Sequence, residues 1–522
     1  MGARGPTDQR PSFIGGPPLP TKTIVQVLQE PLSVKNPHAA GIDVHSRHHV
    51  VSVPPGTTAP QVRTFGCYTP DLHDLIAWLR ACAVTTVAME STGVYWIPLF
   101  QLLAAAGFDV VLVHPDYTKQ AKRAKPHDVA DSIWIPMLHA YGLLPGSFRP
   151  EDAICRLRAF WRLRETLIEE AARWILRLQK ALDQMNLHLH KAITDITGTT
   201  GLLILHSIVD GQTDPAMLAT FRDRRIKCSA EELVKALTGD YRAEHVYALK
   251  IALAMYECLQ QRLVDCDRQV ESELKRFIAQ QEASAASATS QATALERGEA
   301  LAAVMAPAPS SPASVGPPSV DPGATVSPPA GASQTEAPAL VLSAKKSRRK
   351  NCNPAVNYAE ILLQMCGVDL TKFYGISVIT ALTIILEIGL AVTAWPTEKH
   401  FASWLGLSPN HRKSAKKLLS RKTRKGNRRV AWAFRMAALS ASKGNGPYAD
   451  FYRQIRSRKG ANVAITATAH QIAIELYRLL KYGPAYVAHG RQTIEQRQKE
   501  RKRAHLYRLA NELDCTVTER VA

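Results

Sequence analysis

The sequence of 522 residues lacks an apolar run long enough for a membrane-spanning helix, which needs about 20 residues. The longest candidate, at 376–392, is interrupted by Glu387 and Gly389. Residues 1–20 are rich in proline and glycine and lack the apolar core of a secretion signal. These absences predict a chain without a membrane partner.

Paired cysteines are missing as well. Nine cysteines are scattered along the chain, and none belongs to a CxxC pair. This distribution supports neither a zinc knuckle nor a disulfide framework. We therefore expect reduced thiols in an intracellular protein.

Acidic residues are in deficit. The chain has 45 Asp and Glu against 65 Lys and Arg, which gives a formal net charge of +20. Such a charge favours a polyanionic partner, most simply a nucleic acid. An anionic membrane surface is the alternative, and the missing apolar run argues against it.

Aromatic residues are absent between Ile278 and Asn357, where the composition shifts to Ala, Ser, Pro and Thr. Such a segment cannot bury enough apolar surface to offset its loss of conformational entropy. We predict a disordered linker at 282–350 that ends in the basic run KKSRRK. The patterns on either side predict a disordered tail at 1–37, an α/β domain at 38–148, a helical or coiled-coil region at 149–281, a mostly α domain at 351–488 and a charged helical tail at 489–522.

Short β-branched runs in the first domain predict strands. GIDVHSRHHVVSV (41–53) is typical of a strand, a turn and a returning strand, and TTVAMES (85–91) and DVVLVHP (109–115) are further strand candidates. The segments LHDLIAWLRAC and WIPLFQLLAAAG, which lie between them, have helical periodicity. Strands that alternate with helices indicate an α/β layer.

Two long apolar stripes follow in the helical region. They predict either a helical hairpin or coiled-coil arm that serves self-association, or helices that are merely packed into a core. The first stripe contains Leu157, Phe160, Leu167, Ala171, Trp174, Leu178, Met185 and Leu189. The second contains Leu249, Ala252, Tyr256, Leu259, Leu263, Val270, Leu274 and Phe277.

Four carboxylates stand where an α/β domain places its chemistry. Asp43 and Glu90 end predicted strands, and Asp128 and Asp131 open a predicted helix. Asp128 and Asp131 could simply cap that helix and favour its dipole. If the four converge, however, they repel each other unless cations lie between them. An oxygen-only set suits two Mg²⁺ or Mn²⁺ ions, which promote phosphodiester displacement.

A second candidate site is the segment HRKSAKKLLSRKTRKGNRR (411–429), which has ten Lys and Arg and no carboxylate. Contact with phosphates is the functional interpretation, and a solvated basic face is the alternative. The predicted nucleic-acid contacts are Arg412, Lys413, Lys416, Lys417, Arg421, Lys422, Arg424 and Lys425.

These segments together resemble the DEDD-type insertion-sequence transposases with a RuvC-like catalytic domain. The resemblance covers most of 38–488 and includes AMESTGVYWIPLFQLLAAAGFDVVLVHP, DVADSIWIPMLHAYGLLPGSFRP and HFASWLGLSPNHRKSAKKLLSRKTRKGNRRVAWAF. It implies an α/β RuvC/RNase H-like N-terminal domain, a helical coiled-coil middle and a mostly α C-terminal transposase domain, in which FYGISVITALTIILEIG is helix-hairpin-helix-like. It also implies that the four carboxylates are metal ligands.

The same resemblance implies a catalytic serine a few residues after a GLxP motif, normally followed by glycine. GLSPNHRKSA selects Ser414 over Ser408 and Ser420, but Ala415 replaces the glycine. Alanine disfavours positive φ, so this departure bears on the local backbone conformation. A second departure is the order Lys-Pro-His-Asp at 125–128, and we assign no role to its lysine or histidine.

We interpret the chain as a transposase or site-specific recombinase that cleaves and rejoins DNA, with Ser414 as nucleophile. The resemblance implies a site shared between the two domains, a homodimer or homotetramer, and guidance by a structured non-coding RNA. It also implies a bacterial, cytoplasmic protein that works at the nucleoid. The alternatives are a two-metal nuclease of the Holliday-junction type, which needs no serine, and a non-catalytic nucleic-acid-binding protein.

Overall fold

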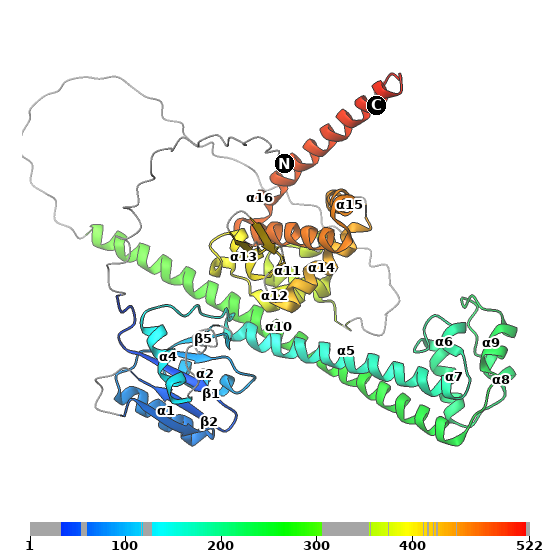
Figure 1. The fold of residues 1–522 in the computed structure, drawn as a ribbon, viewed down its shortest axis with the longest axis horizontal. Coiled ribbons are helices and arrows are strands. Elements are labelled where there is room, and N and C mark those ends of the chain that lie inside the picture. Colours follow the sequence, from blue (N-terminus) through cyan, green and yellow to red (C-terminus); the bar gives the residue numbers. More distant parts are fainter. Residues whose placement is uncertain are drawn as a thin grey trace, which may run out of the picture. The chain divides into compact units, whose positions relative to one another are not determined.

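The computed structural model describes residues 33–53, 60–115, 117, 128–304, 354, 356–373, 375–410, 412–414, 417–420, 422–423, 426–444 and 446–517. At 128–133, 288–304, 412–414 and 417–419, and in parts of the last helix, this description covers the backbone alone. The chain divides into two compact units, Met1–Arg149 and Pro150–Ala522 (Figure 1).

The first unit is built on a five-stranded sheet with the order β3-β2-β1-β4-β5. The strands β1, β2 and β3 form an antiparallel meander, and β4 and β5 run parallel to β1. This is the strand order of the RNase H-like fold, as predicted. The strands are β1 (Ala39–Val44), β2 (His48–Ser52), β3 (Val62–Gly66), β4 (Thr86–Glu90) and β5 (Asp109–Val113).

Helices cover both faces of this sheet. On one face, Ile42 and Met89 belong to a core cluster with Leu75 of α1 (Thr69–Ala81) and Leu99 of α2 (Trp96–Ala105). On the other face, Ala88 and Val113 pack with Ile135 of α4 (Asp128–Ala140). Burial on both faces explains why β1 and β4 are almost continuously apolar up to their terminal carboxylates.

The second unit begins with a helical arm, formed by α5 (Asp152–Gln184) and α10 (Ala243–Val304), which lie side by side (Figure 1). The predicted stripe on α10 is confirmed, because its apolar residues from Leu249 to Phe277 are buried apart from the partly buried Leu259. On α5 the stripe is only partly right, since the predicted Phe160, Leu167 and Trp174 are only partly buried and Trp161 and Arg164 are buried in addition. Four short helices lie at the end of the arm: α6 (Leu189–Ala192), α7 (Thr199–Val209), α8 (Pro215–Ala219) and α9 (Ala230–Leu237).

The backbone of α10 extends past the predicted start of the linker at residue 282. The backbone of α10 stays helical to Val304, through residues 282–304 that composition assigned to the linker. The Ala, Gln, Glu and Leu of ASAASATSQATALERGEALAAV are strong helix formers, and the proline-rich part starts only at Pro307. The rest of the predicted linker, 305–350, and residues 1–32 of the predicted tail lie outside the described residues.

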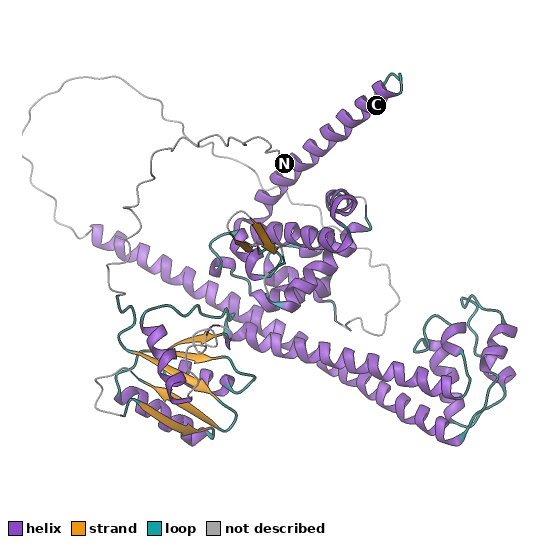
Figure 2. Cartoon of the chain, viewed as in Figure 1, coloured by secondary structure: helices purple, strands orange, loops and turns teal. Residues whose placement is uncertain are grey.

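The remainder of the second unit is mostly helical, as predicted. The unexpected element is a two-stranded antiparallel ribbon, β6 (Arg412–Ser414) and β7 (Lys417–Ser420), which we call the basic hairpin (Figure 2). Lys and Arg are poor strand formers, so this segment carries no strand signal. The helices are α11 (Tyr358–Cys366), η2 (Leu370–Lys372), α12 (Val378–Ile388), η3 (Val392–Ala394), α13 (Glu398–Trp404), α14 (Arg428–Ser442), α15 (Pro447–Lys459) and α16 (Ala461–Glu512), which is interrupted at Gly483.

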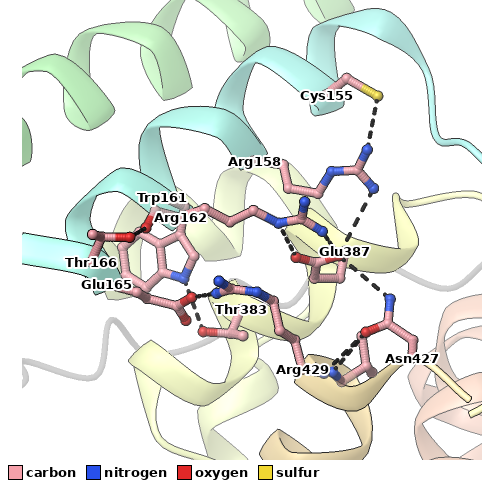
Figure 3. A network of polar contacts seen from close by, with 11 residues as sticks. Cys155, Arg158, Trp161, Arg162, Glu165, Thr166, Thr383, Glu387, Asn427 and Arg429 are labelled. Atoms are coloured by element: carbon pink, nitrogen blue, oxygen red, sulfur yellow. Dashed lines mark hydrogen bonds and ion pairs between the residues drawn. The ribbon is translucent and has the colours of Figure 1, made fainter. Parts of the chain in front are cut away.

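A buried carboxylate joins the arm to these helices. Glu387 of α12, whose side chain is 2% exposed, accepts two hydrogen bonds of 2.7 Å from Arg162 of α5 (Figure 3). Arg158 lies 3.8 Å away, and Asn427, which caps α14, lies 3.5 Å away. Glu387 therefore fixes three helices to each other, and it also interrupts the longest apolar run of the sequence.

Two further predictions concern composition. The eight cysteines within the described residues are free thiols, as predicted. Among the described helices, none combines the length and the apolar character needed to cross a membrane. The apolar run at 376–392 contains α12, which is only 11 residues long.

Candidate active site

Asp43 and Glu90 lie at the carboxyl ends of two neighbouring parallel strands. The register pairs Ile42 of β1 with Met89 of β4, so the next residue on each strand is a carboxylate. The side chain of Asp43 is 14% exposed, and Glu90 is 7% exposed. The fold thus brings two of the four predicted acids side by side, in partly to fully buried positions.

Both carboxylates face helix α4. Side chains alternate along a strand, so Asp43 shares a face with Gly41, and Glu90 shares a face with Ala88. A β-carbon on Gly41 would stand 2.4 Å from Pro136 Cδ of α4, and Ala88 packs in the cluster that contains Ile135. The face that carries α4 is therefore the face that carries the acids.

The direction of α4 brings its first turn to the end of the sheet at which Asp43 and Glu90 lie. Its last carbonyls accept hydrogen bonds from the segment before β1, with Lys35 N 2.8 Å from the oxygen of Ala140. Since Pro136 lies over Gly41, the helix runs antiparallel to β1.

The rise per residue of a strand and of a helix then shows how far along β1 the first turn of α4, which carries Asp128 and Asp131, lies. Two strand residues from Gly41 to Asp43 rise about 6.6 Å, which corresponds to about four residues of helix. Counted back from Pro136, this gives Asp131 or Ser132, and Asp128 lies one turn before. Asp128 is the first residue of α4 that the structure describes. The positions of these carboxyl groups themselves lie outside the described side chains.

The two described acids have weak polar neighbours. His45 Nε2 lies 3.5 Å from Asp43 Oδ2, and the hydroxyl of Thr92 donates to Glu90 Oε1 at 3.2 Å. His45 also stacks on His48, with 4.9 Å between the ring centroids.

The set of residues fits an Mg²⁺ or Mn²⁺ site. Among the described side chains, no three acids, histidines or cysteines are grouped closely enough to hold a metal ion. Asp43 and Glu90 supply two such groups, and the first turn of α4 carries the other two candidates at the matching level. Oxygen donors alone suit hard divalent cations.

Ser414 occupies the last paired position of the basic hairpin before its turn, because it is in register with Lys417. The base of the hairpin is held by the bridge between Pro409 and Thr423 and by the hydrogen bond from Asn410 N to the oxygen of Lys422. A residue at the end of so short a ribbon has its backbone position set by the ladder.

Close backbone packing secures the hairpin base to the helices. A β-carbon on Gly426 would lie 2.4–2.5 Å from backbone atoms of residues 404–406, so only glycine fits there. Asn427 follows directly and accepts hydrogen bonds from the amides of Arg429 and Val430 at the start of α14. The Gly-Asn pair near the end of the basic segment therefore fixes where α14 begins after the hairpin.

The other serines and cations of this segment occupy different environments. Ser408 is partly buried, with its hydroxyl 3.4 Å from His470 Nδ1, and the hydroxyl of Ser420 accepts from the amide of Lys422. Lys422 is exposed. Arg412, Lys413 and Lys417 lie on the two strands, and Lys416, Arg421, Arg424 and Lys425 lie outside the described residues.

Sequence reasoning missed the residues that hold α4 on the sheet. Gly41 and Pro136 set its approach, and His139 contacts Thr86 at its far end. Only the glycine left a usable signal, because a glycine inside a strand often marks close backbone approach.

Comparison with known families is consistent with this arrangement. A model for the DEDD domain of IS110 elements, described as "Transposase", matches residues 40–187, which include the sheet, α4 and all four acids. A second model, described as "Transposase IS116/IS110/IS902 family", matches residues 369–453, which include the basic hairpin and Ser414. No curated protein matches the chain.

Proposed function

The chain belongs to the IS110 family of transposases, enzymes that transfer DNA strands, and on this premise we propose how its residues share the chemistry. Asp43, Glu90, Asp128 and Asp131 hold divalent metal ions, Mg²⁺ or Mn²⁺. When bound, these ions stabilise the charge that develops on the scissile phosphate and its leaving oxygen. The residues of the basic hairpin hold the DNA backbone.

The observation that carries this proposal is the pairing of Asp43 with Glu90 beneath the first turn of α4. Two ionised carboxylates on adjacent strands repel each other, and burial makes their charge more costly. A divalent cation supplies the charge that would make this arrangement stable.

Ser414 is the proposed nucleophile. Its Oγ attacks the phosphorus atom, a phosphoserine ester forms, and one sugar oxygen leaves as a hydroxyl after it takes up a proton. The ester conserves the energy of the phosphodiester bond, so a second sugar hydroxyl can rejoin the strand and release the serine. Neighbouring cations such as Lys413, Lys416 and Lys417 lower the cost of an alkoxide-like oxygen.

Guidance by a structured RNA is part of the same proposal. Its support is the family resemblance and the net charge of +20, which suits a large polyanion in addition to DNA. We also propose that the acids of one domain and the serine of the other act together, in a dimer or tetramer at the bacterial nucleoid.

Self-association has a candidate surface on the arm. Tyr247, Ile251 and Met255 of α10 are 65%, 44% and 40% exposed and follow each other at one-turn spacing, on the side opposite the buried stripe. A helix that is apolar on two sides normally has partners on both. Replacement of Tyr247 and Ile251 by Ser should shift the chain to a smaller oligomer in light scattering, and an unchanged mass would reject this surface.

Asp43→Asn is the experiment that tests the metal site. The variant should lose Mg²⁺-dependent strand cleavage and keep nearly all DNA binding, because the ligands and the basic contacts lie on different segments. Wild-type cleavage by this variant in Mg²⁺ would refute the four-acid site.

The Ser414→Ala variant distinguishes the proposed serine recombinase from the alternative, a two-metal nuclease. A two-metal nuclease would continue to cleave DNA with water after this change, whereas a serine recombinase would lose both cleavage and strand transfer.

A further inference from the structure

The end of α4 opposite the acids carries a buried polar chain. His139 is 4% exposed, and its Nε2 lies 2.9 Å from the hydroxyl of Thr86 on β4. That hydroxyl donates to Asp109 Oδ2 of β5 at 3.2 Å. Because the hydroxyl has one proton and gives it to the carboxylate, it must accept its second hydrogen bond from the imidazole. His139 is therefore a donor through Nε2.

A neutral imidazole is suited to this role. Burial lowers the pKa of His139, and the nearby Asp109 opposes this only in part. Neutral histidine has a proton on one ring nitrogen, and the hydrogen bonds through Thr86 to Asp109 place that proton on Nε2. The helix end is thus tied to two strands at once.

Backbone contacts hold the same end. Asn36 Nδ2 donates to the oxygen of His139 at 2.8 Å, and the amides of Lys35 and Asn36 donate to the oxygen of Ala140. The segment that supplies these donors leads directly into β1, the strand that carries Asp43. The anchored end of α4 and the strand with the first acid are consequently coupled.

We infer that His139 is a positioning residue for the acid site, and that its hydrogen bond to Thr86 fixes how far α4 lies along the sheet. Asp131 lies eight residues from His139, or about 12 Å along a rigid helix. A metal site tolerates ligand displacements of only about 0.5 Å. A slide or rotation of the anchored end would therefore reach the acidic turn. This inference rests on the proposed metal site.

Manganese binding by the full-length protein, measured by calorimetry in the absence of DNA, tests the inference without relying on activity. His139→Leu removes the hydrogen bond, Thr86→Val removes it while conserving shape, and His139→Gln keeps an N–H donor of similar reach. The first two should raise the Kd for Mn²⁺ by about tenfold or more, because a displaced first turn of α4 no longer meets the ligand geometry that the metal requires. His139→Gln should stay close to the wild-type Kd.

Val87→Ala is the matched control. Val87 is buried next to Thr86, but its side chain belongs to the core on the opposite face of the sheet. It should lower the unfolding temperature and leave the Kd for Mn²⁺ unchanged. Equal losses of affinity in Val87→Ala and Thr86→Val would overturn the inference, because His139 would then act through general stability.

The failure of this inference is distinguishable from failure of the metal site. If Asp43→Asn abolishes Mn²⁺ binding while Thr86→Val and His139→Leu bind with the wild-type Kd, the positioning role is wrong and the site stands. If Asp43→Asn binds Mn²⁺ as the wild type does, the site itself is wrong. Should His139→Leu fail to fold, the isosteric Thr86→Val decides.

Discussion

Gly41 of β1 lies directly beneath Pro136 of α4. A β-carbon on Gly41 would stand 2.4 Å from Pro136 Cδ and 2.6 Å from its nitrogen. The second of these atoms belongs to the backbone, so rotation of a side chain cannot relieve the contact. Because Asp43 follows two residues later on the same face, this glycine sets the gap between the strand and helix that carry the acids.

Gly41→Ala should therefore impair catalysis more than stability. The extra methyl group pushes α4 away from the sheet, and a displacement of about 1 Å at an active site can cost about 100-fold in rate. We expect strand cleavage to fall by at least tenfold while circular dichroism stays native. Gly146→Ala is the control, since its nearest atom would lie at an ordinary 3.4 Å. Wild-type cleavage by Gly41→Ala would contradict the close approach.

The ion pair of Arg164 and Asp267 makes a prediction about the arm. Both side chains are buried, at 3% and 4% exposure, and Arg164 Nε lies 2.5 Å from Asp267 Oδ1. Asp267→Asn leaves a buried guanidinium without its counter-charge, which costs about 3–5 kcal/mol.

The double variant Arg164→Met with Asp267→Leu removes both charges and should recover most of that loss in thermal unfolding. A double variant less stable than Asp267→Asn would show that the pair itself stabilises the arm.

The lowered pKa of His139 predicts a pH dependence. In the folded chain burial keeps this imidazole neutral, whereas in the unfolded chain it titrates near its usual pKa of about 6.5. Between the two values the unfolded state binds more protons, so the contribution of His139 to stability is present above pH 6.5 and is lost as the pH falls. The unfolding temperature of the wild type should thus fall further between pH 7.5 and pH 5.5 than that of His139→Gln. Equal losses would contradict the buried neutral state.

The basic hairpin predicts a salt dependence. Replacement of Lys416, Lys417, Arg421 and Lys422 by Gln should weaken duplex binding and lower the slope of log affinity against log salt. Each lost phosphate contact removes about 0.9 from that slope. Arg262 and Arg268 of α10, which pair with Asp265, serve as control positions outside the hairpin. An unchanged slope in the quadruple variant would assign the segment to a solvated surface.

Four of the five strands of the first domain and its helices were predictable because their signals are local, whereas β3 (Val62–Gly66) was not predicted. Asp43 and Glu90 end apolar runs, and the helix over residues 128–140 has its periodicity in the sequence itself. The contacts of Gly41 with Pro136 and of His139 with Thr86 were not predictable, because they join residues far apart in the chain. The basic hairpin escaped prediction for another reason: its pairing is set by Gly426 and Asn427 at its base, and its own residues have low strand propensity.

The central claim is that Ser414 forms a covalent bond to DNA at a site activated by the four acids. Labelled element ends incubated with the protein and Mg²⁺, then run on a denaturing gel, test it most directly. We expect a protein–DNA adduct in wild type, none in Ser414→Ala or Asp43→Asn, and an adduct in Ser420→Ala, whose hydroxyl lies on the same hairpin. Cleaved ends without an adduct in wild type, together with full cleavage by Ser414→Ala, would contradict the serine mechanism and favour a nuclease that uses water.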